Sequence, residues 1–194
     1  MKSKTVRNNV LRFMKLDPAN LIVAKQIHGN NVKVVNSLIK DNVVADCDGL
    51  ITANKKIILG IYTADCIPLL MYVGNSELKV AIHIGWRGLY SGIIENAIEL
   101  LKNRFYVNFG KIKAYIGPHI CPSCYEVGNE ICSVFDIEDS NKLNLSKIVC
   151  EKLNKFGVIN TNIFDIKLCT FHINNLFFSY RRTKCDERIM SVIV

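Results

Sequence analysis

An apolar segment over residues 57–74, interrupted at Asp65 and Pro68, constrains the fold of this chain more than any other feature. The segment is rich in β-branched residues, and the interruptions divide it into pieces of strand length. It therefore predicts two consecutive buried strands and not a membrane span. With 49% hydrophobic residues in 194 positions, the chain can bury a proper core, and we expect residues 1–194 to form a single domain.

Hydrophobic periodicity predicts the remaining elements. Strands are expected over 21–27, 32–36, 48–52, 56–62, 67–73, 78–84, 111–116 and 188–194. Helices are expected over 6–14, 125–135 and 145–156, and after Gly88, where an apolar stripe begins at Ile93. Asn144 is a candidate N-cap and Gly157 a stop for the helix over 145–156. Strands come first and helices later, which favours an α+β layered domain over a regular βαβ alternation.

Charge and cysteine content limit the classes of function. The net charge is +8, spread along the chain, and no helix-turn-helix, RNP-like or paired zinc-finger pattern accompanies it. We therefore expect a solvated surface, with no nucleic acid and no membrane as partner. No apolar signal segment follows the basic start, so we expect a cytoplasmic protein. Its eight cysteines are then expected to be reduced, most of them as small buried side chains.

Three metal-capable side chains stand at the edges of predicted strands. His28 follows the strand over 21–27, Cys66 lies between two apolar strands, and His83 precedes Gly85 at a strand-to-helix junction. Two imidazoles and one thiolate suit catalytic zinc, which keeps a fourth position for water or substrate and lowers the pKa of a bound water toward ~7. Because no short motif joins the three, spacing alone favours each as a core or turn residue with satisfied polar atoms over a metal ligand.

Motifs spread along the whole chain resemble one family. In order they are Gln26-Ile27-His28-Gly29, Asp46-Cys47-Asp48-Gly49-Leu50-Ile51-Thr52, Thr63-Ala64-Asp65-Cys66-Ile67-Pro68, His83-Ile84-Gly85-Trp86-Arg87-Gly88, Ile116-Gly117-Pro118 with Tyr125-Glu126-Val127, and Phe177-Phe178-Ser179-Tyr180-Arg181-Arg182. Together they closely resemble the YfiH-like family, also called laccase-domain or multicopper polyphenol oxidase proteins, whose members act as purine nucleoside phosphorylases. The similarity runs from about Val6 to the C-terminus.

The resemblance implies a layered domain of mixed β-sheets flanked by helices. It also implies a metal bound by His28, Cys66 and His83, with zinc expected and copper as the alternative. The implied activities are phosphorolysis of adenosine, inosine and methylthioadenosine to the base and (methylthio)ribose 1-phosphate, and deamination of adenosine. The catalytic residues would be these three ligands and Arg87, the partners would be a purine nucleoside and phosphate, and a homodimer is left open.

Arginines are the candidates for binding phosphate. Arg87 and Gly88 open the helix after His83, where free N–H groups and the helix dipole favour an anion. Arg181 and Arg182 could add bidentate contacts, although surface ion pairing explains arginines equally well.

Acidic and aromatic residues of the motifs leave further alternatives open. We expect Asp65 to orient a backbone or an imidazole, and Asp46 and Asp48 to support His28 or to cap a turn. Trp86 and the pair Phe177-Phe178 could stack a purine or pack in the core.

The chain departs from the family pattern in several places. It lacks the family's N-terminal hairpin and a Ser-Leu-Asn-Leu-Gly-type segment. Ile84 replaces a small residue, Cys121 stands where glycine is common, and Thr183-Lys184-Cys185 replaces an Asp-Gly turn. These differences leave the three ligands intact and bear on substrate preference.

Three rival functions remain open. Cys66 as nucleophile with His83 as base would make a cysteine hydrolase. Two histidines and a cysteine also resemble a blue-copper set. However, four histidines cannot supply a blue centre plus a trinuclear cluster, so only phenol oxidation by copper at the same ligands is retained. A non-catalytic binding module would turn over no nucleoside.

The stretch Cys121-Pro122-Ser123-Cys124 has the spacing of a redox motif or of half a zinc ribbon. A redox site needs a strand-to-helix turn near a βαβ unit, which this region only half provides, and no second cysteine pair follows. We therefore expect these two cysteines to be structural, like His119 and the pair Cys169 and His172.

Overall fold

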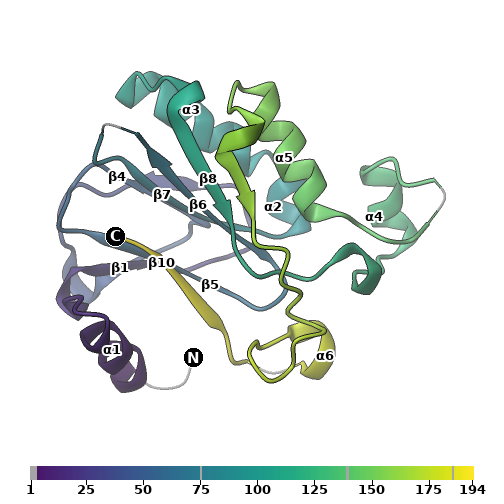
Figure 1. The fold of residues 1–194 in the computed structure, drawn as a ribbon, viewed down its shortest axis with the longest axis horizontal. Coiled ribbons are helices and arrows are strands. Elements are labelled where there is room, and N and C mark those ends of the chain that lie inside the picture. Colours follow the sequence, from purple (N-terminus) through teal and green to yellow (C-terminus); the bar gives the residue numbers. More distant parts are fainter. Residues whose placement is uncertain (1–3, 75, 139, 185) are drawn as a thin grey trace.

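The structure is a computed structural model that describes residues 4–74, 76–138, 140–184 and 186–194. The strands are β1 (Leu21–Ala24), β2 (Val32–Val34), β3 (Val43–Val44), β4 (Gly49–Thr52), β5 (Ile58–Thr63), β6 (Ile67–Val73), β7 (Lys79–Ile84), β8 (Ile112–Ile116), β9 (Ile163–Asp165) and β10 (Ile189–Ile193). They form two mixed sheets (Figure 1). Sheet A has the order β10-β5-β1-β3, and sheet B has the order β2-β4-β7-β6-β8-β9.

Six α-helices accompany the sheets in the described segments. They are α1 (Lys4–Phe13), α2 (Trp86–Tyr90), α3 (Ile93–Phe105), α4 (Asn129–Val134), α5 (Leu145–Lys155) and α6 (Tyr180–Thr183). Short 3-10 turns are η1 (Pro18–Asn20), η2 (Lys40–Asn42), η3 (Phe109–Lys111), η4 (Pro122–Cys124) and η5 (Asn160–Asn162). None of these helices is long and apolar enough to cross a bilayer.

Three clusters of buried apolar side chains separate the layers. Leu11 of α1 packs on the outer face of sheet A. Between the sheets, Leu59 of sheet A meets Leu50 and Ala81 of sheet B. Helices α3 and α5 cover the outer face of sheet B, so the order is helix, sheet, sheet, helices (Figure 1). The predicted α+β arrangement of mixed sheets flanked by helices is confirmed.

The apolar segment that opened the sequence analysis forms β5 and β6, as predicted, but the two strands belong to different sheets. The chain passes from sheet A to sheet B between them, and Asp65 at this crossing has a left-handed backbone with a φ of 88°. Beyond the crossing, β6 and β7 pair antiparallel, with Pro68 opposite His83. This crossing brings the segment around Cys66 to the junction between the sheets.

Several predicted boundaries were wrong. The helix expected over 125–135 begins only at Asn129, because the backbone before it is extended and pairs with residues 141–143 through the Glu126–Lys142 bridge. Strands β3 and β9 and helix α6 were not predicted, since each has four residues or fewer. The capping of α5 is confirmed: Asn144 accepts a hydrogen bond from the Lys147 N–H, and Gly157 has a φ of 91°.

Candidate active site

His28 lies in a loop just after β1. Gln26 holds this loop against the end of β5, because its side-chain amide donates to the Tyr62 carbonyl at 2.7 Å and its amide oxygen accepts from the Tyr62 N–H at 2.8 Å. These bonds replace strand pairing, so β1 ends at Ala24, earlier than predicted. The His28 backbone then turns into the left-handed region, with a φ of 59°.

Asp48 fixes both histidines. Its fully buried carboxylate accepts the N–H groups of Ile27, His28 and Gly29 at 2.9–3.1 Å. It also accepts from Nδ1 of His83 at 2.7 Å, which leaves Nε2 of His83 as the nitrogen available to a metal. Asp48 therefore caps the loop and holds the His28 backbone, the two roles considered for it, and it also orients the His83 ring, which was not predicted.

Cys66 completes the group. It precedes β6 by one residue, and the register of β6 with β7 places it beside His83. One ligand atom each from His28, Cys66 and His83 lies within 4.8 Å of the others. The two imidazole rings meet edge to face at 4.7 Å between centroids. The three distant stretches of chain thus converge on one point, and these residues could hold a metal ion.

Two glycines keep the space around this point open. A Cβ atom at Gly85 would lie 3.1 Å from Sγ of Cys66 and 3.6 Å from Cδ2 of His28. A Cβ atom at Gly88 would lie 2.6 Å from the Gly29 carbonyl oxygen, a contact that real Cβ atoms do not make. Gly88 therefore allows α2 to pack directly on the loop that carries His28, and Gly85 leaves room beside the thiol.

Thiol and imidazole form a charged pair in the absence of metal. Burial raises the pKa of the Cys66 thiol, but the His83 charge and hydrogen bonds from both histidines outweigh it and lower the pKa to about 6. Burial lowers the pKa of His83, yet the Cys66 thiolate and Asp48 raise it to about 9. For Asp48, burial opposes ionisation, while hydrogen bonds from His83 and the Gly29 N–H lower its pKa. A thiolate ready to bind a cation follows.

The three side chains line a cavity of about 960 Å³. Its walls come from the ends of β1 and β5, from β7 and α2, and from α6 with the segment that leads into β10. The Arg87 guanidinium lies 4.4 Å from the centre of the Trp86 ring. That of Arg181 lies 5.3 Å from the Tyr125 ring. Both cations and both rings face the cavity, which therefore offers stacking surfaces and positive charge beside the ligand group.

Two further cavity residues carry polar groups that a ligand could use. Thr63 is buried, and its hydroxyl oxygen has no hydrogen-bond partner among the described residues. Burial, and then the negative charge on Cys66, raise the pKa of Tyr125 to about 12, so its hydroxyl stays protonated and can donate.

The predicted phosphate contacts need two corrections. Arg182 turns away from the cavity, because its guanidinium donates to the carbonyls of Thr170, Phe171 and Phe177 at 2.7–2.9 Å. Helix α2 begins at Trp86 and has only five residues, so it has little dipole to offer an anion. Of the predicted cationic contacts, Arg87 and Arg181 reach the cavity.

Asp65 orients the backbone, as predicted, and no imidazole. It accepts from the Arg181 N–H at 2.6 Å and from the Thr170 hydroxyl at 2.7 Å. Asp46 is exposed and takes no part in this network.

Of the aromatic residues considered for stacking, Trp86 lines the cavity. Phe177 and Phe178 instead belong to the loop before α6, and Cys185 of the altered turn lies outside the described residues.

Sequence reasoning gave no role to Tyr125, Tyr180 or Thr63, all of which line the cavity. Tyr125 and Tyr180 stand inside the motifs that carried the family resemblance, and that position was the available signal. Thr63 also opens one of these motifs, but the sequence does not show which way its hydroxyl faces, because that depends on the pairing of β5 with β10.

A second group of metal-capable side chains was expected to be purely structural. One ligand atom each from Cys121, Cys124, Cys169 and His172 lies within 4.8 Å of the others. By contrast, His119 is buried, and its Nδ1 hydrogen-bonds the Gly117 carbonyl at 2.9 Å. The cysteines in the described segments all carry free thiols.

Comparison with known proteins identifies the family of this chain. A family profile described as multi-copper polyphenol oxidoreductase laccase matches residues 2–194. A purine nucleoside phosphorylase of Clostridium acetobutylicum is 32% identical over 88% of this chain and 75% of its own length. One of Campylobacter jejuni is 31% identical over 91% of this chain and 78% of its own. The crystal structure of a YfiH protein of Bacillus licheniformis, 26% identical, superposes with a TM-score of 0.89 over 97% of this chain and 79% of that one. The chain therefore belongs to the YfiH-like family of laccase-domain proteins.

Proposed function

We propose that this chain is a purine nucleoside phosphorylase with a zinc ion held by His28, Cys66 and His83. The observation that carries the proposal is the convergence of these three ligand atoms, within 4.8 Å of one another, on the wall of a cavity with arginine side chains. The names of the related proteins from Clostridium acetobutylicum and Campylobacter jejuni support the same activity. We include adenosine, inosine and methylthioadenosine as substrates, and deamination of adenosine as a second activity.

The residues present suit a metal. A set of one thiolate and two imidazoles matches the catalytic zinc sites that use three protein ligands, and Gly85 leaves space beside the thiol. When bound, zinc acts as a Lewis acid, attracting negative charge and polarising the groups that approach it. The cavity site has histidines for one ion and not for a cluster, because His119 is bound to a backbone carbonyl and His172 belongs to the other group.

In phosphorolysis, the bond between the ribose C1′ and the purine nitrogen breaks while C1′ bonds to a phosphate oxygen, and the departing base takes a proton. Arg87 and Arg181 would hold phosphate through charge-assisted hydrogen bonds. Trp86 and Tyr125 would confine the nucleoside between ring faces. Thr63 would use its unpaired hydroxyl to bind a polar group of the substrate. These side chains would orient both reactants for in-line attack.

The test is direct. The purified zinc-loaded protein is incubated with adenosine, inosine or methylthioadenosine, with and without phosphate, and the bases are separated by chromatography. We expect free base only with phosphate, inosine from adenosine without it, and neither product with Cys66→Ala. Cys132→Ser is the matched control, since this half-buried cysteine lies outside both ligand groups. Base release that does not depend on phosphate, or full activity of Cys66→Ala, would refute the proposal.

A cysteine hydrolase is the second candidate, and one contact favours it. His83 beside the Cys66 thiol is oriented by Asp48 at 2.7 Å, which is the order of nucleophile, base and orienting carboxylate used in covalent catalysis. Iodoacetamide distinguishes the two functions. A ligand thiolate is protected when zinc is added back to the metal-free protein, whereas a nucleophile that acts without metal stays reactive.

A further inference from the structure

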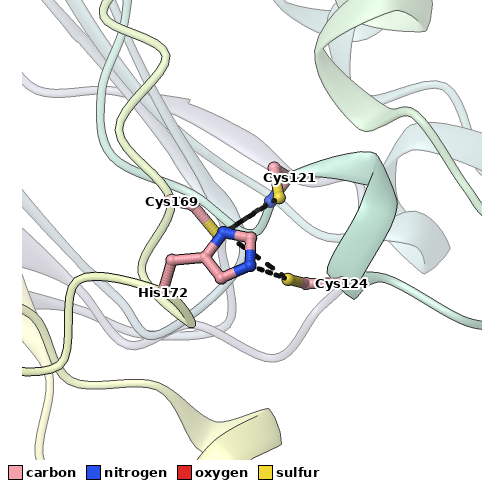
Figure 2. Close-up of side chains that lie close together, drawn as sticks. All are labelled: Cys121, Cys124, Cys169 and His172. Atoms are coloured by element: carbon pink, nitrogen blue, oxygen red, sulfur yellow. Dashed lines mark hydrogen bonds between the residues drawn. The ribbon is translucent and has the colours of Figure 1, made fainter.

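Two loops that leave the same edge of sheet B bring four thiol and imidazole side chains together (Figure 2). Cys121 and Cys124 flank the 3-10 turn η4 after β8, and Cys169 and His172 lie in the loop after β9. Figure 2 shows the His172 ring directed at the two thiols of the first loop. Nδ1 of His172 lies 3.7 Å from Sγ of Cys121 and 3.8 Å from Sγ of Cys124, and Nε2 lies 3.2 Å from Sγ of Cys124.

We propose that Cys121, Cys124, Cys169 and His172 form a second metal site, a closed tetrahedral zinc site with three thiolates and one imidazole. The pairs are spaced C-x2-C and C-x2-H, and such pairs on two loops are the usual way to build structural zinc sites. Zn–S and Zn–N bond lengths put the ligand atoms of a tetrahedral site about 3.6–3.8 Å apart. The distance of 3.7 Å from Cys121 to His172 matches that value.

Two of the sulfurs, those of Cys121 and Cys169, have hydrogen-bonding groups close to them, as ligand thiolates do. The Cys121 backbone N–H donates to Sγ of Cys169 at 3.3 Å, and the Ser123 hydroxyl lies 3.0 Å from Sγ of Cys121. Hydrogen-bond donors aimed at ligating atoms are the outer contacts that tune metal sites. Cys169 is buried, but His172 is exposed and Cys121 and Cys124 are half-buried, so apolar packing does not explain the convergence of all four.

The site would stabilise one wall of the cavity without taking part in the reaction. Its two loops already pair, because the His119 N–H donates to the Leu168 carbonyl and the Thr170 N–H donates to the His119 carbonyl, both at 3.1 Å. From these loops, Ile120 and Thr170 both donate to Asp65, the residue before Cys66. A metal that fixes the loops therefore fixes the frame around the first ligand group.

The experiment isolates this site from the one in the cavity. The full chain carrying His28→Ala and Cys66→Ser is purified under reducing conditions, loaded with zinc and analysed by metal mass spectrometry. We expect one zinc per chain in this background and none after His172→Ala is added. His172 is exposed, so its truncation should leave the core intact, and Cys132→Ser serves as the matched control. The outcome does not depend on nucleoside turnover, and the proposed function could fail while this site stands.

Cobalt supplies an independent measurement in the same background. Three thiolates should give a strong sulfur-to-cobalt charge-transfer band with tetrahedral d–d bands. Cys124→Ser should remove about a third of the charge-transfer intensity or abolish binding. His172→Cys should keep the metal and intensify the band, which a purely packing role of His172 would not produce. Loss of the ion should lower the melting temperature by roughly 5 °C or more. A chain without bound metal, or one with Cys121 and Cys124 joined in a disulfide, would overturn the proposal.

Discussion

Replacing Asp48 by asparagine tests the reasoning about the candidate active site most sharply. The carboxylate is fully buried and accepts four hydrogen bonds, two on each oxygen. Asparagine keeps one acceptor oxygen and places an NH₂ group where two N–H donors already point. Two of the four bonds are therefore lost when the NH₂ group faces Ile27 and Gly29, and the negative charge that orients His83 is removed. When it faces His28 and His83, the His28 bond is lost and His83 can only accept, with its proton moved to Nε2.

The magnitude follows from these contacts. Hydrogen bonds to a charged group contribute ~1.5–3 kcal/mol each, so two lost bonds should lower the free energy of unfolding by about 3–6 kcal/mol. For a chain of this size, each kcal/mol lowers the melting temperature by roughly 2–4 °C, so we expect a decrease of at least about 6 °C. Removing a carboxylate that orients a metal-binding histidine typically weakens metal affinity by ~10–100-fold.

The assay combines thermal unfolding of the metal-free protein with zinc competition against a chromophoric chelator. Asp46→Asn is the matched control, because it removes the same charge from the same loop at an exposed position. We expect this control to leave both measurements near the unsubstituted values. If Asp48→Asn melted within about 2 °C of the unsubstituted chain and kept its zinc affinity within about threefold, Asp48 would not organise the site as described.

Three further predictions follow from the same geometry. Arg87→Ala should raise the KM for phosphate by about tenfold or more with little change in melting temperature, and an unchanged KM would exclude Arg87 from the site. By contrast, Arg182→Ala should lower the melting temperature, because three carbonyls lose their donor. In the metal-free protein, alkylation of Cys66 should titrate near its pKa of about 6, below the ordinary thiol value. The folded pair loses one proton near pH 6 and the other near pH 9, whereas the ordinary pKa values of the separated groups are 6.5 for the imidazole and 9.0 for the thiol. The unfolded chain therefore binds more protons only between about pH 6 and pH 6.5, so this pair should make stability rise slightly with pH there and change it little from pH 6.5 to pH 9. His83→Asn should move the alkylation midpoint upward, and an unchanged midpoint would contradict the pairing. Gly85→Ala should weaken zinc binding, because its Cβ would lie 3.1 Å from Sγ of Cys66, while unfolding of the metal-free chain stays nearly unchanged; equal zinc affinity would show that the space is not needed.

The sequence predicted the long apolar strands well, because burial and periodicity act locally. Strand β6 was predicted to the residue, and β7 within one residue. The sequence could not predict that β5 and β6 lie in different sheets, since that depends on the left-handed turn at Asp65 and on the pairing of each strand with strands distant in the chain. The helix was predicted to begin at Tyr125 and not at Asn129 for a similar reason, because the bridge from Glu126 to Lys142, which is distant in the chain, replaces helical hydrogen bonds.

Site residues were predictable only as far as motifs marked them. His28, Cys66 and His83 were chosen from element edges and family resemblance, and the structure brings their ligand atoms together. Arg182 was chosen by the same reasoning and lies elsewhere, because two neighbouring arginines look alike in sequence while only the fold decides which one meets backbone carbonyls. The convergence of Cys169 and His172 with an earlier cysteine pair likewise depends on two loops meeting in space.

The proposed metal ligands lie at the boundary between the sheets, so metal uptake at this site would require the whole fold. His28 follows a strand of sheet A, His83 belongs to a strand of sheet B, and Cys66 sits where the chain crosses from one to the other. A fragment missing either sheet would lack this site in the cavity, so a partly folded chain would gain nothing from an ion bound there. At a free metal concentration of 100 times the Kd, the native state would gain ~2.7 kcal/mol over every such species. Metal supply should then set how much of this protein survives proteolysis.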